Sequence, residues 1–382
     1  MTLLTVHQDN QPAPATTSPG TQTGNGTGTA TNPRPAAESD PGTGTSAGAG
    51  AGTTPVDPAR MPRLTTTVPR EYVHRSTLAE VFLTGCEQTG DTHYTLTAQW
   101  PRAHTFFTTP DGTHHHPLQA AETIRQTGLY LAHAELGIPL GHHFLMRNLH
   151  LTTHPQHLTI GPTPTDLTLT ATYTPHHPHT KRPTDFTMHI TITRNGHPTA
   201  TGTGRFTCLT PTTYQRLRHP HTTTTTGASA SASASAGTHQ PPNPQPTPTP
   251  THYGRTLPHD IVLTPTPHPH TWQLTPNPHH PILFDHTTDH IPGMVLLEAA
   301  HQATTAHTHP TPTTHPTHPT TLHATFHHYT EHHTPTYITA HTTNTSDNDN
   351  DQTPTPTTHI TAHQNNTTVF TAQLTTHTPT TT

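Results

Sequence analysis

The sequence predicts an α+β fold with two similar halves, each built from a long helix and an antiparallel sheet. Apolar residues recur at helical spacing over residues 117–136, which predicts the helix of the first half. Residues 186–192 alternate with period two and are followed by Asn195-Gly196, which predicts a strand and a tight hairpin. The same segments recur in the same order in the second half, which indicates an internal duplication.

The helix over residues 117–136 is predicted from its ends as well as from its apolar spacing. Pro117 suits the first helical position, and Gly137-Ile138-Pro139 ends the pattern. The residues that follow helical spacing are Leu118, Ala121, Ile124, Gly128, Leu131 and Glu135.

Candidate strands follow this helix at residues 144–146, 167–173 and 186–192. The alternation in the last of these is typical of a half-buried strand. Because Asn195-Gly196 is the strongest short hairpin signal, we expect residues 199–209 to return antiparallel to residues 186–192.

The second half repeats a spacing of three polar residues. In each half a histidine precedes a glutamate by 18 residues, and a glutamine follows the glutamate by four, which places the last two on one helix face. The residues are His104, Glu122 and Gln126 in the first half and His280, Glu298 and Gln302 in the second.

A long helix wrapped by an antiparallel sheet, present twice in one chain, is the arrangement of a double hotdog fold. One such sheet leaves an edge strand that needs a partner, so hotdog units usually pair edge to edge. A duplicated chain can form this pairing internally, so we expect a monomeric pseudo-dimer.

Composition divides the chain into four parts. Only 27% of the 382 residues are hydrophobic and 9% are charged. Residues 1–61 are rich in Gly, Thr, Pro and Ala, and residues 220–251 are a low-complexity linker, so both are predicted to be disordered. The two repeats are predicted at residues 62–219 and 252–378.

Charge and cysteine usage exclude several classes of protein. The net charge is −6, and the 15 basic residues form no run longer than Lys181-Arg182, which argues against a nucleic-acid surface. Cys86 and Cys208 lack the spacing of a disulfide scaffold or a zinc ribbon. No run of ~18 apolar residues predicts a membrane span, and no signal peptide is recognisable. We therefore expect a cytoplasmic protein with no membrane or nucleic-acid partner.

Histidine is frequent, with 43 in the chain. A metal site needs imidazoles that converge on one point, whereas these are scattered with Thr and Pro through predicted linkers and strands. Adjacent residues such as His114, His115 and His116 are expected to point in different directions. We therefore expect no metal site and no cofactor.

Four motifs carry a resemblance to a known family. They are Ala98-Gln-Trp-Pro-Arg-Ala-His104, Glu122-Thr-Ile-Arg-Gln126, His133-Ala-Glu-Leu-Gly-Ile-Pro-Leu-Gly141 and Phe284-Asp-His-Thr-Thr-Asp-His-Ile-Pro-Gly-Met294 with the following Glu298-Ala-Ala-His-Gln302. Together they resemble the AfsA-type A-factor biosynthesis hotdog family. The resemblance implies an acyltransferase of γ-butyrolactone autoregulator biosynthesis. Such an enzyme transfers a β-ketoacyl group from an acyl carrier protein thioester to the hydroxyl of dihydroxyacetone phosphate.

The implied reaction needs a base that takes the proton of the attacking hydroxyl. Glu122 and Glu298 are the candidate bases, and Gln126 and Gln302 are further catalytic candidates beside them. Glu298 lies in a continuous apolar stretch, where a carboxylate needs a partner or a function.

The reaction also needs donors for the thioester oxyanion and a cation for the phosphate. The backbone N–H groups of Gly293 and Met294 are candidate oxyanion donors, because helix N-termini present unpaired donors. Arg125 is the candidate phosphate ligand; alternatively, Glu122 and Arg125 form a solvated surface pair. The remaining substrate-binding candidates are His104, His280 and His301.

One residue departs from the family pattern. His301 stands where the second motif of the family usually has an arginine, and imidazole cannot make the bidentate contact of a guanidinium with phosphate. Either Arg125 in the first half binds the phosphate, or the reaction is lost or altered.

Two alternative functions stay open at this point. One is a catalytically altered or inactive homologue that binds acyl thioesters or carrier protein. The other is a hotdog thioesterase or dehydratase. The resemblance to the dehydratases is weaker, because their catalytic histidine precedes Pro-Gly at a spacing that falls near Phe284, and His286 is two residues too close.

Overall fold

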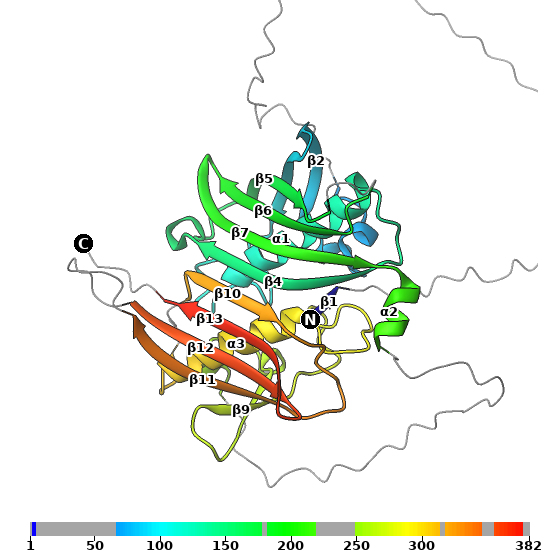
Figure 1. Ribbon diagram of the computed structural model, residues 1–382. Coiled ribbons are helices and arrows are strands. Elements are labelled where there is room, and N and C mark those ends of the chain that lie inside the picture. Colours follow the sequence, from blue (N-terminus) through cyan, green and yellow to red (C-terminus); the bar gives the residue numbers. More distant parts are fainter. Residues whose placement is uncertain are drawn as a thin grey trace, which may run out of the picture.

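The computed structural model describes residues 2–4, 66–177, 182–218, 249–313, 318–345 and 355–376. Most of the segment predicted at 1–61 and most of the linker predicted at 220–251 therefore lie outside the described residues. Within the described part, the chain forms one continuous antiparallel sheet with two long helices (Figure 1).

The sheet contains the strands of both halves in mirrored order. The first half contributes, in spatial order, β2 (Leu83–Gly90), β3 (His93–Trp100), β5 (Thr165–Pro175), β6 (Asp185–Arg194), β7 (His197–Leu209) and β4 (His143–Thr153). The second half continues with β10 (Thr321–Phe326), β13 (Thr367–Thr375), β12 (Thr355–Gln364), β11 (Thr336–Thr345), β9 (Thr271–Leu274) and β8 (Leu263–Pro265). The halves join where β4 pairs antiparallel with β10. The predicted double hotdog with internal edge pairing is confirmed.

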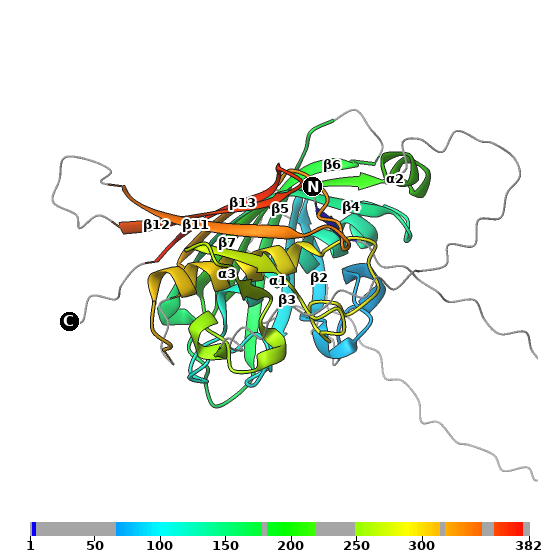
Figure 2. The ribbon, with the colours of Figure 1, turned by 90° about the horizontal axis from the view of Figure 1, so that it is seen from below.

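Two long helices lie on the same face of this sheet (Figure 2). They are α1 (Pro117–Tyr130), which continues as one π-helical turn (Leu131–Glu135), and α3 (Gly293–Thr308). The helix predicted over residues 117–136 is therefore confirmed. A shorter helix, α2 (Pro211–Arg218), follows β7. No described helix is both long and apolar enough to cross a membrane.

Short 3-10 helices occupy several connections. They are Arg70–Val73, Leu78–Glu80, Pro155–His157, Pro250–Tyr253 and Pro258–Asp260. Two of them precede β2 and two precede β8, so the duplication extends to the segments that enter each half of the sheet.

The predicted hairpin at Asn195-Gly196 and its counterpart in the second half, at Asn365-Asn366, form as tight turns. Asn195 and Gly196 have φ of 51° and 80°, and Asn365 and Asn366 have φ of 48° and 60°. Two successive residues with positive φ are typical of a type I′ turn, which asparagine and glycine adopt at low cost. These turns set the antiparallel registers of β6 with β7 and of β12 with β13.

Three residues of the N-terminal segment form a strand. β1 (Thr2–Leu4) pairs antiparallel with Phe144, Leu145 and Met146 of β4. The partner of β4 farther along its length is β10, which pairs with residues 148–152, so β1 covers the part of this edge that β10 leaves open. This differs from the disorder predicted for all of residues 1–61.

Gly128 brings α1 close to β7, and its replacement by alanine is expected to destabilise the protein. A Cβ at this position would lie 2.5 Å from Cζ of Phe206, which is fully buried and stacks on Phe186. In an exposed helix Gly→Ala stabilises by up to ~1 kcal/mol, but here we expect a loss of about 1–3 kcal/mol from overpacking. Urea denaturation of Gly128→Ala measures the sign, and a gain in stability would show that Phe206 can move away.

Candidate active site

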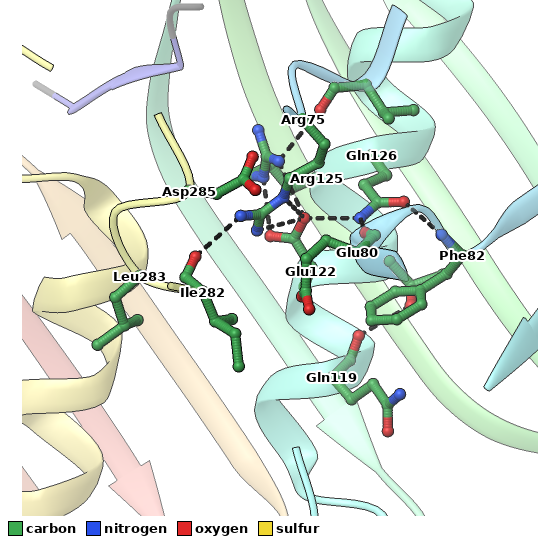
Figure 3. A network of polar contacts seen from close by, with 12 residues as sticks. Arg75, Glu80, Phe82, Gln119, Glu122, Arg125, Gln126, Ile282, Leu283 and Asp285 are labelled. Carbon is green, nitrogen blue, oxygen red and sulfur yellow. Dashed lines mark hydrogen bonds and ion pairs between the residues drawn. The ribbon is translucent and has the colours of Figure 1, made fainter. Parts of the chain in front are cut away.

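Glu122 of α1 lies in a cage of cationic and polar side chains (Figure 3). Arg75 contacts Oε1 of Glu122 at 2.7 Å, and Nε of Arg125 donates to Oε2 at 2.8 Å. Glu122 is 0% exposed and Arg125 is 4% exposed. The alternative of a solvated surface pair is therefore wrong, because the ion pair is buried between the helix and the 3-10 segments that precede β2.

Gln126 connects this carboxylate to the backbone. Its Nε2 donates to Oε1 of Glu122 at 2.8 Å and to the carbonyl of Glu80 at 2.7 Å. Its Oε1 accepts the N–H of Phe82 at 2.9 Å. Gln126 thus fixes the start of β2 against α1, and its amide is fully engaged by the protein.

The second half reproduces this arrangement around Glu298. Arg255 donates to both carboxylate oxygens of Glu298, with Nε at 2.7 Å from Oε1. Nε2 of Gln302 donates to Oε1 of Glu298 and to the carbonyl of Asp260, and Oε1 of Gln302 accepts the N–H of Val262. The sequence correctly placed glutamate and glutamine together in both halves and Arg125 beside Glu122, but it did not indicate Arg75 and Arg255 as partners of the two glutamates.

The two arginines also connect one half to the other. Nη1 of Arg75 donates to the carbonyl of Ile282 at 3.0 Å, and Nη1 of Arg255 donates to the carbonyl of Phe106. Each arginine therefore neutralises a glutamate of its own half and binds a loop of the other. We refer to this pair of contacts as the crossed arginines.

His104 and His280 hold the loops that receive the crossed arginines. Nδ1 of His104 accepts the N–H groups of Phe106 and Phe107, and Nδ1 of His280 accepts those of Ile282 and Leu283. With Nδ1 accepting, the ring proton lies on Nε2, which faces Glu80 at 3.3 Å in the first half and Asp260 at 2.9 Å in the second. Both ring nitrogens of each histidine are thus occupied by the protein.

The cage keeps Glu122 ionised. Burial alone would raise the pKa of Glu122, but Arg125 and Arg75 outweigh burial and lower this pKa from 4.5 to about 2. A carboxyl group with a lowered pKa in the folded state stabilises the fold above its unfolded pKa, and this contribution is lost as the pH falls towards the folded pKa.

Replacement of Glu122 by glutamine is therefore expected to have a pH-dependent cost. The difference in free energy of unfolding between wild type and Glu122→Gln should be constant above about pH 5.5. It should narrow below pH 4.5, by up to ~3 kcal/mol as the pH approaches 2. Urea denaturation at several pH values measures this difference in free energy. A difference that stays constant down to the lowest pH at which both proteins fold would contradict the prediction.

A cavity of about 880 Å³ opens beside this network in the second half. This volume lies within the range of small-molecule sites. Leu274, Phe284 and Ile291 contribute apolar surface, and Asp285 and His286 contribute polar groups. The cavity therefore combines an apolar wall with an acid and an imidazole on one loop, residues 284–291.

Two carboxylates attach this loop to the first half of the chain. Asp285 accepts the N–H groups of Ser76 and Thr77, which directly follow Arg75. Asp289 accepts a hydrogen bond from the hydroxyl of Tyr214 and forms an ion pair with Arg218, and both of these residues lie on α2. The loop is anchored on both sides of His286 by residues of the first repeat.

His286 lies between these anchors and lines the cavity. Its Nδ1 is 3.7 Å from Oδ2 of Asp285, an ion-pair distance longer than a hydrogen bond. Burial alone would raise the pKa of Asp285, but the neighbouring His286, the N–H of Ser76 and the charge of Arg75 lower it well below its usual range. An ionised carboxylate therefore faces Nδ1 of this imidazole and favours a proton on that nitrogen.

Comparison with known proteins agrees with the fold. The chain matches the A-factor biosynthesis hotdog domain, AfsA, over residues 56–210 and 239–380. The chain belongs to the AfsA family. Among its relatives, the 2-oxo-3-(phosphooxy)propyl 3-oxoalkanoate synthase of Streptomyces virginiae is 40% identical over 307 residues, which cover 80% of this chain and 96% of that protein.

More distant relatives of this AfsA-family chain carry the same name. The 2-oxo-3-(phosphooxy)propyl 3-oxoalkanoate synthase of Streptomyces griseus is 31% identical and covers 80% of this chain and 93% of its own length. Among solved structures, the 12:0-ACP thioesterase from Umbellularia californica is 8% identical, with a TM-score of 0.43 over 74% of this chain and 94% of that chain.

The two half-sites of this AfsA-family chain differ at one helical position. Arg125 binds Glu122 through Nε and Nη2, and Nη2 also donates to the carbonyl of Val73. His301 occupies the corresponding position on α3, is 1% exposed and has no hydrogen-bond partner on either ring nitrogen. Glu122 therefore has two arginine partners, whereas Glu298 has only Arg255 among the described residues.

The helix starts also differ between the halves. In the first half His116 caps α1, because its Nδ1 accepts the N–H of Leu118 at 3.2 Å. In the second half α3 begins at Gly293 after Pro292, whose side chain makes no cap. The first N–H groups of α3, at Gly293 and Met294, thus have no acceptor within the helix, and Ile291 just before them lines the cavity.

Sequence analysis missed the loop residues Asp285, His286 and Asp289 as site candidates. All three lie in the motif that carries the family resemblance, but the spacing of His286 to Pro292-Gly293 does not match that of the dehydratases and so gives no sign of a role. The useful signal was an acid next to a histidine in a loop that leads into a helix N-terminus. What could not be read from the sequence is that the first repeat anchors this loop.

Proposed function

We propose that the protein is an acyltransferase of γ-butyrolactone autoregulator biosynthesis. It would transfer a β-ketoacyl group from an acyl carrier protein thioester to the hydroxyl of dihydroxyacetone phosphate. The name of its relatives specifies a 3-oxoalkanoate ester of a phosphooxypropyl group. The observation that carries the proposal is the cavity of about 880 Å³ in which His286 lies beside Asp285.

In this proposal His286 is the base. With its proton on Nδ1, towards Asp285, the imidazole has a lone pair on Nε2 that can take the proton of the triose hydroxyl. The resulting alkoxide attacks the thioester carbonyl and forms a C–O bond. When the tetrahedral intermediate collapses, the C–S bond breaks, and the carrier thiolate takes the proton back from the imidazolium. The negative charge of Asp285, 3.7 Å from Nδ1, stabilises the imidazolium.

The N-terminus of α3 is the proposed oxyanion site. The N–H groups of Gly293 and Met294 have no acceptor within the helix, and the positive end of the helix dipole favours a developing negative charge. Ile291, which lines the cavity, is two residues from Gly293, so the thioester carbonyl can approach both donors from that side.

For the phosphate we retain Arg125 as the proposed ligand. Its Nε and Nη2 bind Glu122, so the contact would use Nη1, which has no hydrogen-bond partner among the described residues. Asp285 and Arg75 adjoin the same group, so a phosphate here would lie close to His286.

We assign Glu122, Glu298, Gln126 and Gln302 positioning roles rather than the acid–base role expected from the sequence. Their oxygen and nitrogen atoms bind arginines and backbone groups, and the pKa of Glu122 is lowered by Arg125 and Arg75 to about 2, which makes this carboxylate a weak base. His104 and His280 are likewise assigned to hold the loops, because both ring nitrogens are occupied.

The test is a product analysis with the full chain. Purified protein is incubated with a β-ketoacyl thioester of acyl carrier protein and with dihydroxyacetone phosphate, and the products are identified by mass spectrometry. We expect a phosphorylated 3-oxoalkanoyl ester that forms only when the triose phosphate is present. Free acid formed at the same rate without the triose would indicate a thioesterase. Bound thioester without turnover would indicate a non-catalytic homologue.

A further inference from the structure

Three histidines converge where the two halves meet, away from the cavity. His116 caps α1 in the first half, His301 lies on α3, and His318 lies just before β10. One ring nitrogen of each lies within 4.8 Å of the other two. The expectation that the histidines of this chain would not converge on a point is wrong at this position, because α1 and α3 bring together residues that are far apart in the sequence.

The three imidazoles offer nitrogens that the protein leaves without partners. Nε2 of His116, both nitrogens of His301 and Nδ1 of His318 are buried and make no hydrogen bond. His116 is 0% exposed and His301 is 1% exposed. Buried polar atoms are nearly always satisfied, so four such nitrogens in one place point to a site that binds a ligand.

We propose that His116, His301 and His318 form a structural binding site for a divalent transition-metal ion, with zinc as the expected ion. Three neutral imidazoles supply three of the four ligands of tetrahedral zinc, at Zn–N distances of about 2.0–2.1 Å. This places the nitrogens about 3.4 Å apart, so a small inward movement from the present separations completes the site.

The surroundings support a structural role. The adjoining cavity, which Leu118, Leu151 and His301 help to line, has a volume of about 10 Å³. That is space for about one water molecule as the fourth ligand and for no substrate. A metal here would connect α1 of the first repeat to α3 and to the start of β10 in the second.

Charge and hydrogen bonding permit the site. Arg255 acts electrostatically on all three imidazoles, but its charge is compensated by the ion pair with Glu298. Coordination through Nε2 of His116 moves the ring proton to Nδ1. Nδ1 can then no longer accept the hydrogen bond of 3.2 Å from the N–H of Leu118. The metal therefore replaces one cap hydrogen bond.

A second group of potential ligands shows the contrast. His259, Asp260 and His280 also approach one another, but His280 uses Nδ1 for two backbone N–H groups and Nε2 for Asp260. That group is satisfied without an ion, whereas the group of His116, His301 and His318 is not.

The test measures zinc binding and thermal stability in the full chain. After treatment with EDTA, the protein is loaded with Zn²⁺, passed through gel filtration and analysed for metal content. We expect one retained zinc per chain. We also expect Tm to rise by about 5–10 °C at saturating Zn²⁺, because an ion that binds only the folded state stabilises it.

Two variants and one control make the test specific among 43 histidines. His301→Arg introduces the residue that Arg125 provides in the first half, and His318→Asn removes a ligand outside the helices. Both should lose the retained zinc and the rise in Tm while keeping a cooperative unfolding transition without metal. His323→Asn changes an exposed histidine that stacks on His150 and should behave as wild type.

Either of two outcomes would overturn the proposal. One is a wild-type protein that retains no zinc. The other is retention of the same amount of zinc by wild type, His301→Arg and His318→Asn, which would place the metal on other histidines. Neither outcome depends on the acyltransferase assay.

Discussion

His286→Asn is expected to lower kcat by about 10²–10⁴-fold, the usual contribution of a general base. Asparagine preserves much of the polarity of the side chain but cannot take the proton of the triose hydroxyl. Because the loop is anchored through Asp285 and Asp289, we expect the fold and KM to change little. Initial rates of ester formation over a range of triose phosphate concentrations separate the effect on kcat from the effect on KM.

His333→Asn is the matched control for this variant. His333 also lines the cavity but belongs to the segment between β10 and β11 and not to the loop that carries Asp285 and His286. Its replacement should leave kcat within a few-fold of wild type. Equal losses in the two variants would mean that the cavity binds substrate through its histidines in general, and near-normal kcat in His286→Asn would remove this residue from the proposed mechanism.

Arg255→Met is expected to cost about 3–5 kcal/mol in the free energy of unfolding, because it leaves the carboxylate of Glu298 buried without a cation. For a protein of this size this corresponds to a fall in Tm of roughly 10 °C. The replacement keeps much of the side-chain volume and removes the charge. Differential scanning calorimetry and urea denaturation measure the two quantities.

Arg75→Met provides the control, because it removes the symmetry-related residue. Glu122 keeps its ion pair with Arg125, so we expect a smaller cost of about 1–2 kcal/mol for the lost hydrogen bonds. Each variant loses one hydrogen bond to a carbonyl of the other half. The difference in free energy of unfolding between the two variants therefore measures the contribution of Arg125, the second cation beside Glu122. Equal losses in the two variants would show that Arg125 does not compensate for Arg75.

Local signals in the sequence were sufficient for much of the fold. The helix at residues 117–136 and the hairpins at Asn195-Gly196 and Asn365-Asn366 depend on periodicity and on residues that accept positive φ, and these are properties of short segments. The recurrence of similar segments in the same order, together with the repeated spacing of histidine, glutamate and glutamine, predicted the duplication.

The contacts of the site depend on packing between distant segments. Arg75 is 47 residues from Glu122 and 207 residues from Ile282, and no periodic pattern connects them. In the same way, the grouping of His116 with His301 follows from the approach of α1 and α3, which composition and spacing do not specify. The positions of the polar residues and the neighbours within one helix could thus be predicted, but not the partners that come from distant segments.

The crossed arginines have a consequence for how the chain unfolds. Arg75 and Arg255 each bind a glutamate of their own repeat and a loop carbonyl of the other repeat. Neither repeat alone therefore supplies every hydrogen-bond partner of its buried arginine and of its loop carbonyl. If one repeat lost its structure, the loop carbonyl of the other repeat would lose its arginine donor. The arginine of that other repeat would in turn lose its carbonyl acceptor. We therefore expect the two repeats to unfold as a single cooperative unit, although each has the helix and strands of a separate hotdog domain.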